Sequence, residues 1–397
     1  MPRHYLGLCA IAKDETPFLR EWAAYYHRIG FERIFIYDNG SAVPVRDTVA
    51  DMYDAGMLDT YTIQGDNMQL VAYNHCLQTH GAECEWMAFF DLDEFLLLRR
   101  EEDARAFLAG YEDYAGLSIN SNYFSSSGHL RRPEGLVMEN YRECLGLRHV
   151  VKCIVRPAQV EMPISPEHFL FKEGGYAVNA DKIPVYGAYV PLSTDHALLN
   201  HYVFRSQQDY EEKVRRGHPI WIMPDVLTMN NFYRQAEQRV ETQTEIIRHA
   251  PHVAAIMRTG APAPRHALDS SQVLAEPFGL ALARLAAVVE SGDYDLARLV
   301  FLLGRSRFAD KSAYLALGSR ACRAAGDSEN AKKAALALLA LSPALSSYLE
   351  LLLACEVGGE TTQAEALASF LRTFAEKEGA EDILAVLREK GFSTEKE

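Results

Sequence analysis

The sequence predicts an α/β domain with a mostly parallel sheet flanked by helices, followed by an all-α domain. Two observations carry this prediction. Between residues 5 and 90, short apolar runs alternate with amphipathic segments, which is the pattern of β-α units. After residue 271, the composition becomes rich in Ala and Leu and contains a repeat. A chain of 397 residues is long enough for two domains with cores of their own.

The elements of the first domain follow from the spacing of apolar residues. A strand is expected at 5–12, and a helix at 16–29 with Pro17 in its first turn and Gly30 at its end. Trp22, Tyr25 and Tyr26 recur there at helical spacing, so we expect them in the core rather than on a sugar-stacking surface. Further elements are expected as a strand at 33–38, a helix at 44–55, a strand at 57–63, a helix at 69–79 and a strand at 86–90.

The helical rhythm is lost between about 117 and 205, where Gly, Pro, Ser and Tyr are frequent. Strand-like runs such as "VVKCIVRP", "HFLF" and "HALLNHYVF" predict an antiparallel addition to the sheet with long loops. Helices are expected again at 206–216 and 231–248. The sequence thus predicts domains at 1–258 and 272–397, joined by a linker at 259–271.

The second domain carries an internal repeat. Glycines recur there at intervals of 34 and 33 residues, and alanines recur at the same intervals: Gly292, Gly326, Gly359, Ala297, Ala331 and Ala364. This is the spacing of tetratricopeptide repeats, with one helix-turn-helix in each repeat. A protein partner or self-association through these repeats is a hypothesis that this pattern raises.

Composition excludes several classes of protein. A net charge of -14 argues against a broad nucleic-acid surface. The seven cysteines contain no C-x-x-C pair, so neither a disulfide framework nor a zinc cage is indicated. No apolar run approaches the roughly 18 to 20 residues that span a bilayer. We expect a cytoplasmic protein, and peripheral contact with the inner face of the membrane is left open.

Acidic residues follow three of the predicted strands. The run "WMAFFDLDEFLLL" places Asp91, Asp93 and Glu94 among apolar residues, although an unpaired buried charge costs several kcal/mol or more. Ligands of open α/β sheets bind at the carboxyl ends of the strands. Two carboxylates one residue apart at such an end suit Mg²⁺ or Mn²⁺, which can hold a diphosphate. The alternative is that these acids only cap a turn.

Three motifs in order resemble nucleotide-sugar-dependent glycosyltransferases of families 2 and 92, which share the GT-A fold: "CAIAKDETPFLREWAAYYHRIGFERIFIYDNGS", "QLVAYNHCL" and "WMAFFDLDEFLLL". The resemblance covers roughly residues 5 to 220. It implies a GT-A-like, Rossmann-like sheet and a D-x-D motif at Asp91 and Asp93, with Asp93 the better candidate for direct metal binding. It also implies a donor site for the nucleoside and its phosphates that includes Lys13, Asp14, Glu15, Asp38, Asn39 and Asp91.

Other site residues remain open at this stage. Such folds commonly add a late histidine as a metal ligand, for which His201 in "LLNHYVFRS" is favoured over His168. An inverting transfer needs a base that takes the proton of the acceptor hydroxyl, and Glu167 and Asp195 are the candidates. The candidates for contacts with phosphate are basic residues from two segments: Lys152 and Arg156, or Arg205, Lys213, Arg215 and Arg216.

The leading hypothesis is a metal-dependent glycosyltransferase. It would move a sugar from a nucleoside diphosphate, most simply a UDP-sugar, to a saccharide acceptor, with inversion of configuration and a role in polysaccharide biosynthesis. A haloacid-dehalogenase-type phosphatase fits less well, because Glu94 and Phe95 follow the second acid and the motif begins only at position 91. The third hypothesis is a scaffold that binds a protein partner through its repeats.

Overall fold

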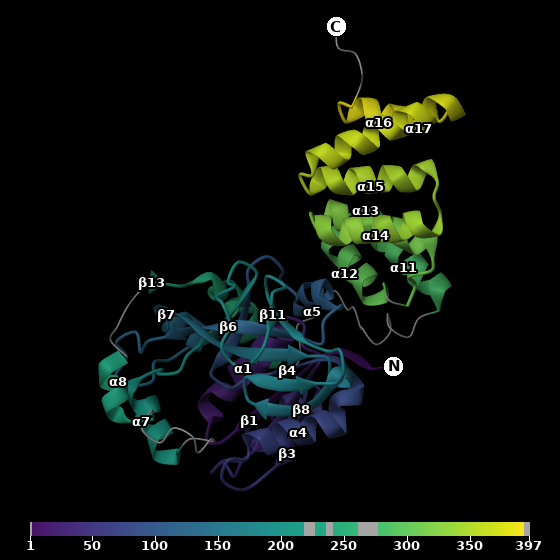
Figure 1. Ribbon diagram of the computed structural model, residues 1–397. Coiled ribbons are helices and arrows are strands. Elements are labelled where there is room, and N and C mark those ends of the chain that lie inside the picture. The colour runs from purple at the N-terminus through teal and green to yellow at the C-terminus, as the bar shows by residue number, and fades with distance from the viewer. Residues whose placement is uncertain (1, 218–226, 236–240, 261–276, 306, 393–397) are drawn as a thin grey trace. The chain divides into compact units, whose positions relative to one another are not determined.

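The computed structural model describes residues 2–217, 227–235, 241–260, 277–305 and 307–392. The chain divides into two compact units, residues 1–265 and 266–397 (Figure 1). Most of the predicted linker, 259–271, lies outside the described residues. The domain limits drawn from the sequence therefore stay predictions at this junction.

Four parallel strands form one half of the main sheet in unit 1, with β3 at its edge. They lie in the order β4-β1-β2-β3, with bounds β1 (His4–Ala12), β2 (Arg33–Asp38), β3 (Leu58–Thr62) and β4 (Cys84–Phe89). The connecting helices are α1 (Thr16–Arg28), α2 (Val45–Thr48), α3 (Ala50–Asp54) and α4 (Gln69–His80), followed by the 3-10 helix η1 (Gly81–Glu83). The helix predicted at 44–55 is thus two short helices that are interrupted at Val49.

An antiparallel addition extends this sheet, as predicted. β7 (Glu143–Val155) lies antiparallel to both β4 and β6 (Gly116–Phe124). β12 (Ala197–His201) runs parallel to β6 and antiparallel to β5 (Glu94–Leu98). The remaining elements of this region are β10 (Ala177–Asn179) and β11 (Pro184–Val185) in the main sheet, β8 (Val160–Ser165) and β9 (His168–Phe171) in a separate hairpin, and the short helices α5 (Ala104–Leu108), η2 (Ala109–Tyr111), α6 (Val137–Asn140) and η3 (Pro157–Gln159).

The end of unit 1 differs from the prediction. α7 (Gln207–Arg216) forms where it was expected, but the helix predicted at 231–248 is wrong. The described parts of that segment are α8 (Met229–Gln235), β13 (Glu241–Thr242) and the 3-10 helix η4 (Glu245–His249), followed by α9 (Ala250–Thr259). β13 pairs with the first two residues of β7, so a long-range strand contact overrides the local helical pattern. The fold class itself, an α/β domain with a mostly parallel sheet flanked by helices and followed by an all-α region, is confirmed.

Helix α1 is a central part of the core. Trp22, Tyr25 and Tyr26 have no exposed surface, which confirms the interpretation of their spacing. Their polar atoms all donate to backbone carbonyls of the segment that follows β4: Trp22 Nε1 to Asp91 (3.0 Å) and Glu94 (3.1 Å), Tyr25 to Leu96 (2.6 Å) and Tyr26 to Glu94 (2.9 Å). A buried carbonyl without a donor is costly, so these bonds fix the turn after β4 in place.

Unit 2 consists of helices in which each described helix packs on the next one along the chain (Figure 1). Gly292, Gly326 and Gly359 follow helices with φ of 78°, 77° and 71°, the left-handed conformation that glycine adopts without strain. The repeated glycines thus mark the turns, while the type of repeat stays a prediction. The helices are α11 (Phe278–Ser291), α12 (Tyr294–Gly304), α13 (Ser312–Ala324), α14 (Ser328–Leu341), α15 (Leu345–Val357), α16 (Thr361–Glu378) and α17 (Glu381–Glu389).

Two further sequence expectations bear on the whole chain. All seven cysteines are buried and free, which agrees with the expected lack of a disulfide framework. In the part of the chain that the structure describes, no helix combines the length and the apolar character that crossing a membrane requires.

Unit 1 is predicted to fold without unit 2, because its sheet and core are formed within residues 1–265. A fragment of these residues should keep a cooperative urea transition with the same midpoint as the full chain. Tryptophan fluorescence is a suitable probe, since Trp22, Trp86 and Trp221 all lie in unit 1. A fragment that loses this transition would place the domain boundary elsewhere.

Candidate functional site

The ends of the parallel strands bring the predicted acids to one edge of the sheet. Asp14 and Glu15 follow β1, Asp38 ends β2, and Asp91 follows β4, which lies next to β1. The backbone N–H of Asn39 donates to the carbonyl of Ala12 (2.8 Å), so the loops after β1 and β2 are in direct contact. Because ligands of open α/β sheets bind at this edge, the convergence defines the candidate site.

Asp38 binds the loop that follows it. Its carboxylate accepts hydrogen bonds from the backbone N–H groups of Ser41 (2.9 Å) and Val45 (3.0 Å). Asp14 has a φ of 54° and accepts a bond from the N–H of Ala42 (2.8 Å), which links the first loop to the second. These two acids therefore shape the wall of the site.

Two other residues of the predicted donor site flank these loops. The side-chain amide of Asn39 donates to the carbonyl of Gly65 (3.1 Å). Lys13 is exposed in the loop after β1. The hydrogen bond of Asn39 is not with a residue of the D-x-D motif.

Glu15 is buried between two arginines. Arg205 Nη1 donates to Glu15 Oε2 (2.7 Å), and Arg216 pairs with the other carboxylate oxygen. The guanidinium of Arg205 also lies 3.7 Å from the ring centroid of Phe18 and donates to the carbonyl of Leu92 (3.1 Å). Burial acts to raise the pKa of Glu15, but the two arginines outweigh it and lower this pKa.

Asp91 and Asp93 face different cations. Asp91 accepts hydrogen bonds from Gln69 Nε2 (2.7 Å) and Lys152 Nζ (2.9 Å). Asp93 accepts one from Lys213 Nζ (2.7 Å), and its other oxygen lies 3.4 Å from His201 Nε2. The positive charge that the sequence requires beside these acids is therefore present as side chains of the protein, rather than only as a bound ion.

Two of the predicted metal ligands lie next to one another. Asp93 Oδ1 lies 3.4 Å from His201 Nε2, and carboxylate oxygens and imidazole nitrogens are both ligand types that divalent cations accept. Mg²⁺ and Mn²⁺ suit a site with few protein ligands, because waters and phosphate oxygens complete their shell. Within the described residues, no group of three or more His, Cys, Asp or Glu side chains is suited to hold a metal. Asp91 faces Lys152 instead, and His168 begins β9 in the separate hairpin.

Neighbouring opposite charges shift the pKa values of Asp93 and Lys152. Burial acts to raise the pKa of Asp93, but Lys213 and His201 hold it well below its usual value. Burial acts to lower the pKa of Lys152, but Asp91 and Glu94 hold it well above its usual value. Asp93 therefore stays ionised and Lys152 stays charged at neutral pH.

Helix α7 supplies cations to the same cleft. Lys213 and Arg216 lie three residues apart on the helix and line a pocket with Asp14, Asp93 and Arg205. Arg215 lines an adjoining hollow with Asp14 and Arg216. Arginine and lysine side chains grouped in this way suit a phosphate ligand.

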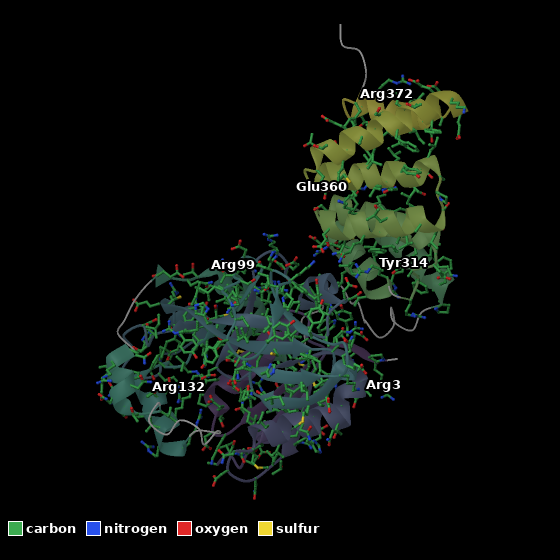
Figure 2. The ribbon with its side chains drawn as sticks, in the orientation of Figure 1. Arg3, Arg99, Arg132, Tyr314, Glu360 and Arg372 are labelled. Carbon is green, nitrogen blue, oxygen red and sulfur yellow. The ribbon has the colours of Figure 1, made fainter. Side chains whose placement is uncertain are left out.

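The position of α7 is fixed at its first turn. Ser206 and Asp209 form a reciprocal capping box, in which the Ser206 side chain accepts from the Asp209 N–H. Arg132 donates to Asp209 (2.7 Å) and to Glu212 (2.9 Å), and Figure 2 shows Arg132 in the region of this helix. The cations of α7 are thus held on a rigid element.

The structure brings one of the two candidate bases to the site. Glu167 lies in the turn between β8 and β9, with Oε1 3.8 Å from Lys152 Nζ. Asp195 is exposed and precedes β12, whereas His201 ends this strand, so Asp195 lies at its opposite end. Arg156 is also remote: it pairs with Glu85 at the start of β4, because β7 runs antiparallel to β4. Asp195 and Arg156 are therefore not joined to the other candidates.

Two residues of the site were not assigned from the sequence. Gln69 is buried in the first turn of α4 and binds Asp91, and the quoted motif "QLVAYNHCL" begins with this residue. Glu94 is buried within the D-x-D segment and lies near His201 and Lys152. Their polar character inside apolar segments is the signal that would have identified them.

The pair of Glu15 with Arg205 is predicted to stabilise unit 1. Glu15→Gln leaves Arg205 with an uncompensated buried charge, so we expect a loss of about 3–5 kcal/mol in the free energy of unfolding at pH 7. Because folding lowers the pKa of Glu15, this stabilisation is present above the usual glutamate pKa of 4.5 and is lost as the pH falls through the folded value. Urea unfolding followed by tryptophan fluorescence from pH 7 to pH 3 measures both effects.

A matched control is Glu85→Gln, which removes the partly exposed pair with Arg156. This change should cost only about 0–1 kcal/mol. Equal losses in the two variants would contradict the special role of the Glu15 pair.

The chain is similar to several known proteins. A glycosyltransferase family 92 protein of Ricinus communis is 29% identical over 232 residues, which cover 54% of this chain and 37% of that protein. A galactan beta-1,4-galactosyltransferase of Arabidopsis thaliana is 27% identical over 136 residues, which cover 31% of this chain and 25% of that protein. The chain thus spans little more than a third of the first relative's length. The crystal structure of S. aureus TarS 1–349 in complex with UDP matches 80% of this chain and 91% of that chain, with a TM-score of 0.30 and 14% identity.

The model of the family described as glycosyltransferase family 92 matches residues 4–252, which is more than half of the chain. The matched segment begins with β1 and ends in α9, so it includes the strand ends, the D-x-D segment and α7. The chain belongs to glycosyltransferase family 92.

Proposed function

We propose that this chain is a metal-dependent glycosyltransferase that moves a sugar from a nucleoside diphosphate donor to a saccharide acceptor with inversion. The observation that carries the proposal is the pairing of Glu15 and Asp93 with cations at the carboxyl edge of the parallel strands. Membership of family 92 supports this function over a phosphatase or a scaffold. A cytoplasmic location and a partner for unit 2 stay predictions.

The donor's diphosphate is assigned to the cleft beside α7. Lys213 and Arg216 can donate charged hydrogen bonds to the oxygens of a diphosphate, and Asp93 with His201 would hold Mn²⁺ or Mg²⁺ next to them. When bound, this ion neutralises the charge that develops on the leaving diphosphate. Asp14 after β1 and Asp38 at the end of β2 shape the part of the cleft that is assigned to the nucleoside.

Glu167 is the proposed general base. It is the candidate that lies near Lys152, which also pairs with Asp91, while Asp195 lies at the other end of β12. Its carboxylate takes the proton of the acceptor hydroxyl as that oxygen attacks the sugar carbon. Lys152 holds the neighbouring Asp91 in place and balances part of the negative charge.

The first prediction of this function concerns nucleotide binding. The protein should bind UDP in the presence of Mn²⁺, and Asp93→Asn should weaken this binding at least about tenfold, because a metal ligand is lost. Calorimetric titration with UDP and GDP, with and without Mn²⁺, measures the effect and identifies the base of the donor.

Asp195→Asn is the matched control, since it makes the same chemical change at the opposite end of β12. It should leave the Mn²⁺-dependent binding unchanged. If the folded wild-type protein binds neither nucleotide in the presence of Mn²⁺, the proposed function is wrong.

The second prediction concerns the base. Glu167→Gln should lower kcat by roughly 10²–10⁴ and leave the donor KM almost unchanged, because general base catalysis contributes on this scale. UDP-galactose is the first donor to test, given the name of the Arabidopsis relative, and transfer can be followed by release of UDP against a panel of oligosaccharide acceptors. Wild-type activity in Glu167→Gln would remove Glu167 from the mechanism.

A further inference from the structure

Arg148 on β7 lies beside the candidate site and forms no ion pair within the part of the chain that the structure describes. Its side chain is partly exposed, its guanidinium lies 5.1 Å from the ring centroid of Tyr123, and its Nη1 donates to the carbonyl of Leu147 (3.4 Å). Other cations of the site already pair with carboxylates: Lys152, Arg205, Lys213 and Arg216. Arg148 can therefore accept an anionic ligand without breaking an ion pair.

The strand register places Arg148 on the face of the sheet that carries the site. Arg148 lies opposite Ser121 in the pair of β7 and β6. Tyr123, two residues further along β6, lies beside His201 of β12. Residues opposite one another share a face, as do residues two apart on one strand. β7 has two residues more than β6 in this stretch, an even number that preserves the alternation, so Lys152 also lies on this face.

The loop before β12 adds an exposed aromatic side chain to the same face. Tyr189 is 73% exposed and forms an antiparallel bridge with Val150. Val150 is two residues from both Arg148 and Lys152 along β7, so the side chain of Tyr189 shares their face. An exposed tyrosine ring offers a flat apolar surface with a polar end, which suits a sugar ring with its hydroxyl groups.

These residues lie on the side of the site where the acceptor has to enter. The leaving diphosphate is assigned to the cations of α7, and the proposed base Glu167 lies 3.8 Å from Lys152 Nζ. In an inverting transfer the acceptor oxygen attacks the sugar next to the base, on the face opposite the leaving group. The face of β7 that carries Arg148 and Lys152 is therefore on the acceptor's side.

We propose that Arg148 and Tyr189 form the acceptor subsite, and that the acceptor is a saccharide with an anionic substituent, a carboxylate or a phosphate. Tyr189 stacks on a sugar ring of the acceptor, and Arg148 pairs with the anion. A guanidinium binds either kind of anion through two parallel hydrogen bonds. This inference rests on the proposed function, because it specifies the acceptor of that transfer.

A glycan array tests the class of acceptor. The full chain is applied, with UDP and Mn²⁺ present, to an array of neutral oligosaccharides, oligosaccharides that contain uronic acids, and phosphorylated oligosaccharides. We expect preferential binding to glycans that carry a carboxylate or a phosphate, and the array distinguishes these two sources of charge. Equal or stronger binding to neutral glycans, or binding to none of the glycans, would overturn the inference.

Variants of the full chain test the two residues separately, with calorimetry on the glycan that binds best. Arg148→Gln should weaken its binding about 10–100-fold and abolish the preference over a neutral counterpart, because a charged hydrogen-bond donor is lost. Arg148→Lys should retain part of the preference, since it keeps the charge without the planar fork. Tyr189→Ala should weaken the binding of charged and neutral glycans alike, by about 2–10-fold.

Two variants at the opposite end of the sheet are the controls. Arg156→Gln changes the same residue type on the same strand, and Tyr176→Ala removes a tyrosine that is 40% exposed and precedes β10, which pairs with the start of β6. Both should bind glycans like the wild type. Unchanged glycan affinity in Arg148→Gln, or loss of its Mn²⁺-dependent UDP binding, would remove Arg148 from the acceptor subsite.

Failure of this inference differs from failure of the proposed function. A protein that binds UDP with Mn²⁺ and prefers neutral glycans contradicts only the acceptor class assigned to Arg148. A protein that binds charged glycans through Arg148 and binds neither UDP nor GDP contradicts the proposed transfer and retains the glycan site.

Discussion

Unit 1 must balance the charge of the carboxylates that it encloses at the end of its central strands. Glu15 and Asp93 are buried, and Asp91 is partly buried. Their cationic partners come from segments distant in the chain: Lys152 on β7, Arg205 after β12, and Lys213 and Arg216 on α7. Since an uncompensated buried charge costs several kcal/mol, the positions of β7 and α7 stabilise this edge of the sheet. The same pairs that stabilise the fold therefore assemble the site.

The backbone of the acidic turn is held as firmly as its side chains. Trp22 and Tyr26 on α1 donate to carbonyls of the turn, so α1 supports the D-x-D segment from the core side. Glu21, on the same helix, accepts the N–H groups of Val137 (2.7 Å) and Met138 (3.1 Å) at the start of α6. One helix thus connects the turn after β4 with the loop that carries Arg132, and a site built on such supports needs little reorganisation when a ligand binds.

Local patterns in the sequence predicted the parts of the fold that depend on local interactions. The β-α units, the core position of Trp22 and the acids at the strand ends follow from apolar spacing. Which residues meet across the sheet depends on whether neighbouring strands run parallel or antiparallel. The spacing of apolar residues does not encode this. Lys152 and Arg156 are four residues apart on one stretch of chain, yet about 13 Å of extended strand separates them, so only Lys152 reaches the D-x-D segment. The helix expected at 231–248 failed for a similar reason, because β13 pairs with β7.

The charge balance also bears on why donor and metal would bind together. In the described site Glu15, Asp91 and Asp93 each already have a cation, so a diphosphate alone would add negative charge to a cleft that contains Glu15 and Asp93. A divalent ion alone would add positive charge beside Lys213 and Arg216. Each separate event is opposed by a like charge at short range, which is costly where water is excluded. Together the two ligands nearly cancel, Asp93 can pass from Lys213 to the metal, and the cations of α7 can pass to the phosphates without leaving a charge unpaired. If metal and donor bind as proposed, the ion pairs of the free protein hold the binding groups in place and favour the joint entry of both ligands over the entry of either alone.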